Sequence, residues 1–237
     1  MKFRHFIYIV TLTLCSASLH LAIAQESQDL PSKHGDRVVD TGTLGGPNSF
    51  LGFEGSRNIN NNGTLAAGTD TSAPATPPFC LNDWKHVQII DLGTIEGGYE
   101  SAAFAVNNRG EVVGGFVNTI QDPYSPFGLQ VRAFLWQDGV MRDLGTLGGP
   151  DATAYFINDS GQVAGNAFTD YSANPVTGLP TQDPFLWENG IVLDLGTLGG
   201  TFGIANYLDN RGRVIGQSNV AGDLSQHPFL WTKAHGM

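Results

Sequence analysis

The 237-residue sequence lacks several motifs by which enzymes and nucleotide-binding proteins are identified. It contains no G-x-S-x-G, H-E-x-x-H, C-x-x-C or phosphate-loop motif. Charged residues make up only 14%, and 12 basic residues stand against 22 acidic ones, which gives a formal net charge of −10. This acidic balance argues against nucleic acid and against anionic membrane surfaces as partners. The sequence therefore predicts no catalytic residue, no cofactor and no metal site.

Cysteine and histidine are also scarce. The two cysteines are Cys15 and Cys80, and Cys15 lies in a segment that we expect to be removed, so no disulfide can form within the mature chain. We interpret Cys80 as a small buried apolar side chain, with a reactive thiol as the alternative. No two of the histidines that remain have the spacing of a metal-binding pair; they are His34, His86, His227 and His235.

Residues 1–24 have the features of a secretory signal peptide. Lys2 and Arg4 precede an apolar run, and Ala22-Ile23-Ala24 forms an A-x-A cleavage site. A membrane anchor is the alternative, which the polar residues within the run disfavour. We predict a secreted, extracellular or cell-surface protein that does not insert into the membrane after cleavage. Loss of Lys2 and Arg4 leaves 10 basic against 22 acidic residues, a net charge of −12.

What the chain does contain is an internal repeat. The phrase DLGTLGG stands at 143–149 and 194–200, with DTGTLGG at 40–46 and DLGTIEGG at 91–98. The copies begin 51, 52 and 51 residues apart, and a period of that size indicates a repeat architecture. We divide the mature chain into an N-terminal segment (25–39) and a repeat domain (40–237) with repeats 1 to 4 at 40–90, 91–142, 143–193 and 194–237.

Each repeat has the turn signals of β-hairpins. In the first hairpin, an apolar stretch meets an Asn- or Asp-rich turn and is followed by a second apolar stretch that ends in Gly. The turn glycines are Gly63, Gly110, Gly161 and Gly212, and the strand-end glycines are Gly68, Gly114, Gly165 and Gly216. In the second hairpin, RAFLWQDGVMRDLG (132–145) and DPFLWENGIVLDLG (183–196) place Asp-Gly or Asn-Gly between two strands, the strongest short-range hairpin signal.

About four strands in about 51 residues is the size of one propeller blade. The sequence therefore predicts an all-β fold, a β-propeller-like array of about four blades with four strands each, as a closed ring or a fragment of a larger propeller. We further predict that a strand around Val38-Val39 pairs with the strand at 229–231 and closes the ring. Trp84, Trp136, Trp187 and Trp231 follow the repeat, which favours a core role over ligand stacking.

These motifs resemble the HAF-repeat family of extracellular bacterial repeat proteins. The matching stretches are LGTLGG, INDSGQVAG (157–165) and HPFLW (227–231), with RAFLW and DPFLW as variants. The likeness covers about 200 residues in four registered copies. Repeat 1 departs from it, because FCLNDW replaces the aromatic strand. The resemblance implies export and a repeat architecture, and it implies no activity and no catalytic residue.

The acidic residues are the one feature of the sequence that is compatible with an enzyme. Asp40, Asp91, Asp143 and Asp194 recur with the period, so we interpret them as structural residues at strand ends with satisfied hydrogen bonds. Propeller glycosidases use paired carboxylates, and a secreted carbohydrate-active propeller enzyme is therefore the alternative function. That alternative requires two non-periodic carboxylates that face each other across a cleft.

Asymmetry between the repeats indicates where binding would occur. Repeats 2 and 3 carry insertions, at 118–130 and 168–183, and insertions in repeat proteins emerge on one face that is often used for binding. The candidate binding residues are Tyr124, Phe127, Phe168 and Tyr171, since aromatic side chains dominate interfaces. The alternative is two variable loops without a function. The favoured function is a non-enzymatic extracellular scaffold that binds a protein or a glycan.

Overall fold

The computed structural model describes residues 45–51, 58–62, 64–71, 90–98, 100–175 and 177–237. It contains β-strands and no helix within these ranges, so the prediction of an all-β fold is confirmed for them. None of them forms a helix that could cross a membrane. All belong to one compact unit, residues 43–237. The expected signal peptide and the strand around Val38-Val39 lie outside the described residues, as do Trp84 and Cys80.

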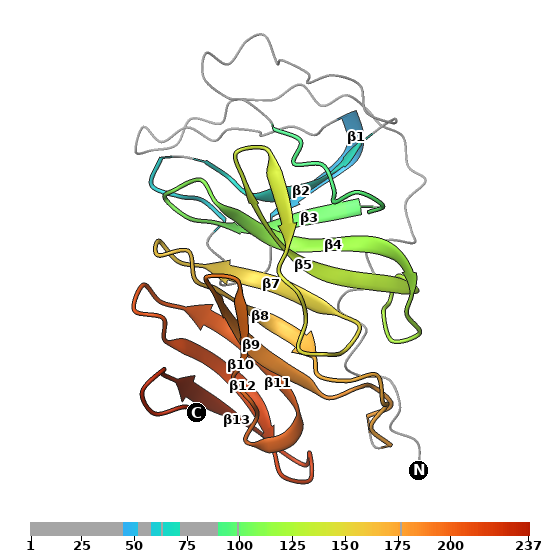
Figure 1. The fold of residues 1–237 in the computed structure, drawn as a ribbon, viewed down its shortest axis with the longest axis vertical. Coiled ribbons are helices and arrows are strands. Elements are labelled where there is room, and N and C mark those ends of the chain that lie inside the picture. The colour runs from blue at the N-terminus through green and yellow to red at the C-terminus, as the bar shows by residue number, and fades with distance from the viewer. Residues whose placement is uncertain (1–44, 52–57, 63, 72–89, 99, 176) are drawn as a thin grey trace, which may run out of the picture. The chain divides into compact units, whose positions relative to one another are not determined.

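The strands follow the repeats (Figure 1). Repeat 1 supplies two described strands, repeats 2 and 3 supply an antiparallel series of four each, and repeat 4 supplies three. The strands are β1 Gly45–Leu51, β2 Ala67–Thr71, β3 Glu100–Val106, β4 Val112–Gln121, β5 Leu129–Gln137, β6 Val140–Asp143, β7 Ala152–Ile157, β8 Val163–Phe168, β9 Gln182–Glu188, β10 Ile191–Asp194, β11 Gly199–Leu208, β12 Val214–Val220 and β13 Gln226–Trp231. A single parallel pair, Phe202 with Gln182, joins β11 to β9.

The second hairpin of repeats 2 and 3 forms at the predicted dipeptides. Asp138 and Gly139 connect β5 to β6 with φ values of 50° and 83°, and Asn189 and Gly190 connect β9 to β10 with 52° and 85°. Two successive residues with positive φ define the type I′ turn, whose twist matches that of the paired strands. The local sequence thus fixes the register of this hairpin in both repeats.

The sheets of successive repeats pack face to face. Ala105, Val113 and Leu135 of repeat 2 form one core cluster with residues of repeat 3 such as Ala154 and Val163. A second cluster joins repeat 3 to repeat 4, and a third lies within repeat 2 and includes Ala66 of repeat 1. Because sheets cover both of its faces, β4 is buried at six consecutive positions instead of alternating.

The repeated Asp-Leu-Gly marks the point where the chain leaves each unit. The carboxylates of Asp91, Asp143 and Asp194 accept the backbone N–H of the glycine two residues later, at 2.9, 2.7 and 2.8 Å. Those glycines, Gly93, Gly145 and Gly196, have φ values of 68°, 89° and 71°, which glycine adopts without strain. Asp143 and Asp194 are therefore the strand-end structural residues that the sequence predicts. Asp91 makes the same hydrogen bond within residues 90–98, which contain no strand, and Asp40 lies outside the described residues.

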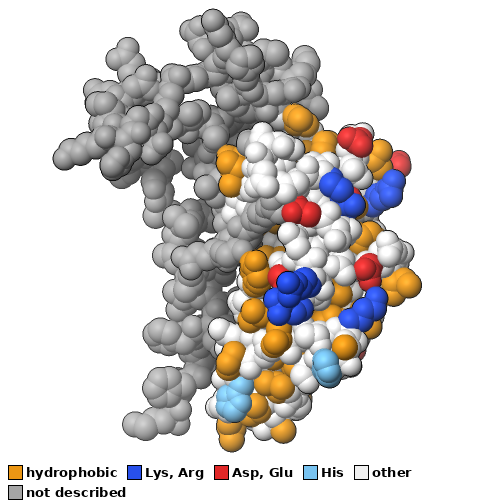
Figure 2. Space-filling model, turned by 90° about the vertical axis from the view of Figure 1, so that its left-hand side faces the viewer, with side chains coloured by type: hydrophobic (Ala, Val, Ile, Leu, Met, Phe, Trp, Pro, Cys, Tyr) orange, Lys and Arg blue, Asp and Glu red, His pale blue; other side chains and the backbone are white. Residues whose placement is uncertain are grey.

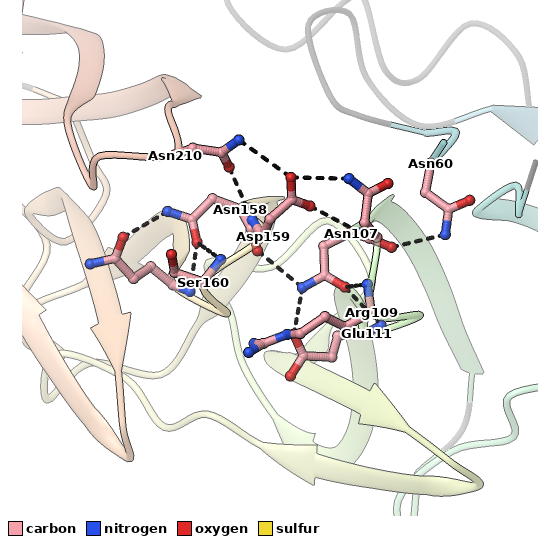
Figure 3. A network of polar contacts seen from close by, with 10 residues as sticks. Asn60, Asn107, Arg109, Glu111, Asn158, Asp159, Ser160 and Asn210 are labelled. Carbon is pink, nitrogen blue, oxygen red and sulfur yellow. Dashed lines mark hydrogen bonds and ion pairs between the residues drawn. The ribbon is translucent and has the colours of Figure 1, made fainter. Parts of the chain in front are cut away.

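A ladder of side-chain hydrogen bonds links the turns of the first hairpins (Figure 3). The amide of Asn60 donates to the carbonyl of Asn107 at 2.9 Å, Asn107 to that of Asn158 at 3.0 Å, and Asn158 to that of Asp209 at 2.9 Å. The side-chain oxygen of each turn's first residue also accepts two N–H groups of its own turn. Each of these Asn side chains therefore accepts hydrogen bonds within its own turn and donates one to the turn of the next repeat. At the fourth turn the Asp209 carbonyl accepts this bond, and the Asp209 side chain has no amide hydrogen to donate.

In repeats 2, 3 and 4 the second strand continues beyond the glycine that was predicted to end it. Nothing larger can replace this glycine. A Cβ on Gly114, Gly165 or Gly216 would lie 1.9–2.1 Å from a carbonyl oxygen of the neighbouring strand. It would also lie within 2.8 Å of the ring of Phe134, Phe185 or Phe229. These glycines let the phenylalanine of the third strand pack directly on the backbone.

The periodic tryptophans belong to the packing between strands and sheets. Trp231 is 6% exposed and lies in the cluster between repeats 3 and 4. Trp136 and Trp187 are half-buried and pack against the edges of their clusters. The core role is therefore confirmed for these three residues, with Trp231 buried most completely.

Candidate functional site

The two insertions are loops at the strand ends opposite the turn ladder. Residues 122–128 connect β4 to β5, and residues 169–181 connect β8 to β9. Figure 1 shows both loops on the right, with the turns of the first hairpins on the left. Figure 2 looks onto the side where those turns lie, and its described part carries both basic and acidic side chains. The turns and the insertions therefore occupy different faces.

The structure brings Tyr124 and Tyr171 together. The phenolic O–H of Tyr124 donates to the backbone carbonyl of Tyr171 at 3.1 Å, across 47 residues of sequence. The half-buried ring of Tyr124 thus joins the insertion of repeat 2 to that of repeat 3. The two loops form one continuous surface, which we call the insertion face.

Each loop is also held by its own hydrogen bonds. In repeat 2, Tyr124 N donates to the Asp122 carboxylate at 2.9 Å and Asp122 N donates to Gly128 O at 3.0 Å. In repeat 3, Thr169 N donates to Thr181 O at 2.9 Å and Asn174 N to Leu179 O at 2.8 Å. These bonds fix the loops before any partner arrives, which reduces the entropy lost on binding.

The four candidate residues separate into two groups. Phe127 and Tyr171 are 59% and 60% exposed and present large aromatic surface to solvent. Phe168 is only 8% exposed and is the last residue of β8, so it is a core residue and not a loop contact. The sequence analysis assigned Phe168 to the insertion because the sequence alone does not show that β8 extends to this residue. Phe127, Tyr171 and the edge of Tyr124 remain as the aromatic groups of the insertion face.

A buried carboxyl pair lies at the root of this face. Asp122 is 2% exposed, and its Oδ2 has no hydrogen-bond partner among the described residues. Asp151, at the entry to repeat 3, accepts the backbone N–H of Val131 at 2.8 Å. Burial, together with the neighbouring Asp122 carboxylate, raises the pKa of Asp151 to about 7. The pair lies where the repeat 2 loop meets the entry to repeat 3, because Asp122 belongs to that loop and Asp151 precedes β7.

Repeat 3 contains a second carboxyl pair where repeat 2 has an ion pair. Arg132 and Asp143 lie 3.1 Å apart on β5 and β6. In repeat 3 the same positions are Asp183 and Asp194, and Asp183 Oδ1 is buried without a partner among the described residues. Burial, with the Asp194 carboxylate nearby, raises the pKa of Asp183 to about 7. Asp183 of repeat 3 thus stands where repeat 2 has Arg132, and two neighbouring carboxyl groups take the place of the salt bridge.

A polar cavity of about 320 Å³ lies beside the turn ladder. Asn61, Asp159 and Asn210 line it from repeats 1, 3 and 4, and Tyr207 completes the wall. Among the described residues of this lining, Asp159 is the single carboxylate, and it accepts hydrogen bonds from Asn108 and Asn210. The described lining therefore does not supply the two facing carboxylates that glycoside hydrolysis uses.

Histidine and metal chemistry have little support in the described ranges. No group of three or more His, Cys, Asp or Glu side chains there is arranged to hold a metal ion. His227 is an exposed residue of β13, and His235 pairs with the Thr232 hydroxyl at 3.2 Å. His34 and His86 lie outside the described residues.

Comparison with known proteins gave no matching family model, no matching curated protein and no matching solved structure. The class that the coordinates define is an all-β repeat protein with antiparallel units stacked face to face.

Two features of the site were missed in the sequence. The Asn ladder has a visible signal, because Asn107 and Asn158 stand 51 residues apart and Asp209 follows after another 51. We interpreted these residues only as turn formers. The Asp122–Asp151 pair has no such signal, since both residues fall outside the periodic acids and meet only in the folded chain.

Proposed function

We propose that this protein is a secreted, non-enzymatic binding scaffold of the HAF-repeat type, a propeller-like array of about four blades that acts outside the cell or at its surface. The insertion face is its recognition surface, and the partner is an extracellular protein or glycan. The hydrogen bond from Tyr124 to the Tyr171 carbonyl carries this proposal, since it joins two otherwise unrelated loops into one surface.

Exposure and rigidity support this assignment. Phe127 and Tyr171 present aromatic area on a frame whose backbone is already hydrogen-bonded. Aromatic side chains on a prearranged frame give large contact area at low entropic cost. The repeated units beneath supply a stiff support, because their sheets bury apolar residues on both faces.

The carbohydrate-active enzyme has weaker support. The Asp122–Asp151 pair is non-periodic, as that alternative requires, but Asp122 is buried at 2% exposure and does not line the cavity. Asp183 is 8% exposed and faces a periodic strand-end acid. In both pairs one carboxyl group is buried, which does not favour access of a sugar.

A binding screen of the mature chain, residues 25–237, against glycan and extracellular-protein arrays tests the proposal. The matched control is a variant whose two insertions are shortened to the length found in repeat 4. We expect at least one partner that binds the mature chain and not the shortened variant. Partners that bind both chains equally, or release of sugar from a glycan without stable binding, would argue against a scaffold of this kind.

A further inference from the structure

Asp151 lies between the two insertion loops and contacts both. Its carboxylate accepts the backbone N–H of Val131 at 2.8 Å, on β5 after the repeat 2 loop. Its carboxyl group is also the hydrogen-bonding neighbour of the Asp122 side chain, at the start of that loop. Its backbone carbonyl accepts the N–H of Phe168 at 2.9 Å, directly before the repeat 3 loop. One residue therefore contacts both ends of one loop and the base of the other.

Asp122 in turn positions the aromatic side chain that joins the two loops. Asp122 Oδ1 accepts the backbone N–H of Tyr124 at 2.9 Å, and the Tyr124 hydroxyl donates to the Tyr171 carbonyl at 3.1 Å. The loops thus meet at two connected points, the Asp122–Asp151 pair and the hydrogen bond from Tyr124 to Tyr171. A displacement of the Asp122 side chain therefore alters the second contact as well as the first.

The second oxygen of Asp122 has no hydrogen-bond donor among the described residues. Asp122 is 2% exposed, and its Oδ2 is buried. A proton on either acid supplies a donor, because a carboxylic acid donates one O–H to a neighbouring carboxylate. Burial and the Asp122 carboxylate raise the pKa of Asp151 to about 7, so the pair loses this proton as the pH rises through neutrality. Two like charges then repel each other across a buried contact.

The other charged groups near the pair offset this repulsion only in part. Among the described residues, Arg132 on β5 is the cation that acts on Asp151, and its guanidinium is already paired with Asp143 at 3.1 Å. The repeat 3 loop adds Asp170, whose carboxylate accepts the backbone N–H of Ser172 at 2.7 Å. The remaining titratable groups of the two loops are tyrosine phenols, which are uncharged near neutral pH.

We propose that the Asp122–Asp151 pair is a pH-sensitive switch of the insertion face, closed while the pair shares a proton and open once both carboxyl groups are ionised. In the closed state the pair holds the repeat 2 loop against repeat 3. In the open state Tyr124 loses its support, and the two loops no longer form one surface. The switch regulates the proposed function of the insertion face and rests on it, so recognition is stronger in mildly acidic surroundings than in alkaline ones.

Hydrogen exchange of the mature chain, measured by NMR at pH 5 and pH 8 and converted to protection factors, tests the switch without any partner. We expect protection of the Tyr124 and Val131 amides to fall at least about tenfold at the higher pH. The Asn158 amide, in a turn of the ladder, should change less. Asp122→Asn keeps an oxygen for Tyr124 N and adds an N–H for Asp151, so its loop should be protected equally at both pH values.

Asp183→Asn is the matched control, because it removes the other buried acid whose pKa is raised to about 7. A loss of loop protection that Asp122→Asn abolishes and Asp183→Asn retains supports the switch. Equal protection of the wild-type loop at both pH values overturns it, as does a loss that persists in Asp122→Asn.

Asp151→Asn provides the same test if Asp122→Asn does not fold, since its amide accepts from Val131 N and donates to Asp122. The exchange data require no partner, so they stand whatever the binding screen finds. Failure of the switch and failure of the binding scaffold are therefore told apart.

Discussion

The side-chain amide of Asn107 donates to the backbone carbonyl of Asn158, one repeat further along the chain, at 3.0 Å. Asn107 is fully buried, and its Oδ1 also accepts the N–H groups of Arg109 and Glu111. A single side chain therefore forms the turn of repeat 2 and its bond to repeat 3. This accounts for the asparagine at the first position of the turn in repeats 1, 2 and 3, where repeat 4 has Asp209.

Removal of this amide should destabilise the protein. Asn107→Ala leaves the Asn158 carbonyl and two turn N–H groups without their partner, and unsatisfied buried groups cost about 1–3 kcal/mol each. We expect a loss of at least about 2 kcal/mol in the free energy of unfolding, measured by urea denaturation. Asn62→Ala is the control, since Asn62 is exposed and its amide donates to the Asn108 carbonyl outside the buried ladder; equal losses in the two variants would show that the buried ladder bond contributes no more than this exposed one.

The glycines inside the second strands, Gly114, Gly165 and Gly216, should tolerate no side chain. Gly165→Ala would place a Cβ 2.0 Å from the Thr153 carbonyl oxygen, so strands β7 and β8 must separate, at a cost of roughly 3 kcal/mol or more. Gly115→Ala is the control, because its nearest neighbour is a Val131 methyl group at 3.2 Å, which can move. Thermal denaturation compares them, and a similar melting temperature for both would contradict the close approach.

Trp136, Trp187 and Trp231 should contribute unequally to the free energy of unfolding. Trp231→Ala removes a side chain that is 6% exposed, and we expect a loss of about 3–5 kcal/mol from the cavity. Trp136→Ala and Trp187→Ala remove half-buried rings and should cost less, about 2–3 kcal/mol. Denaturant titration gives the order, and a larger loss for Trp136 than for Trp231 would be inconsistent with the packing described.

Stability should fall as the pH rises from about 4 to about 7. The pKa values of Asp151 and Asp183 are raised from 3.8 to about 7, so within this window the folded protein holds protons that the unfolded chain has released. The contribution of these groups is complete below their unfolded pKa and is lost as the pH passes their folded pKa. We expect a higher melting temperature at pH 5 than at pH 8.

Two substitutions separate this effect from other titrations. Asp183→Asn should reduce the difference in melting temperature between pH 5 and pH 8, because the amide does not ionise. Asp183→Arg should restore the ion pair seen between Arg132 and Asp143 and stabilise the protein at pH 8. Asp138→Asn changes an exposed turn residue and should retain the wild-type dependence. A wild-type pH dependence in Asp183→Asn would assign the effect to other groups.

The sequence predicted the local elements well and the contacts between repeats poorly. Asn189-Gly190 and Asp138-Gly139 mark their hairpins because type I′ turns depend on two residues alone. Asp143 and Asp194 were assigned correctly as strand-end residues, because each carboxylate accepts an N–H only two residues further along the chain. The burial of Phe168 and the meeting of Asp122 with Asp151 depend on where strands end and which sheets touch. Such contacts are properties of the fold, and no single stretch of sequence contains them.

The most direct test of the binding scaffold is a titration of any partner from the screen against three chains by biolayer interferometry. The first is the mature wild type, the second carries Tyr124→Ala and Tyr171→Ala, and the third carries Ile191→Ala, an exposed apolar residue away from the insertion face. Loss of an aromatic contact at the centre of an interface costs about 2 kcal/mol or more, which corresponds to at least about a thirtyfold weaker Kd. We expect that loss in the double variant alone, with melting temperatures of all three within a few degrees. Equal affinity for the three chains would contradict the assignment of recognition to the insertion face.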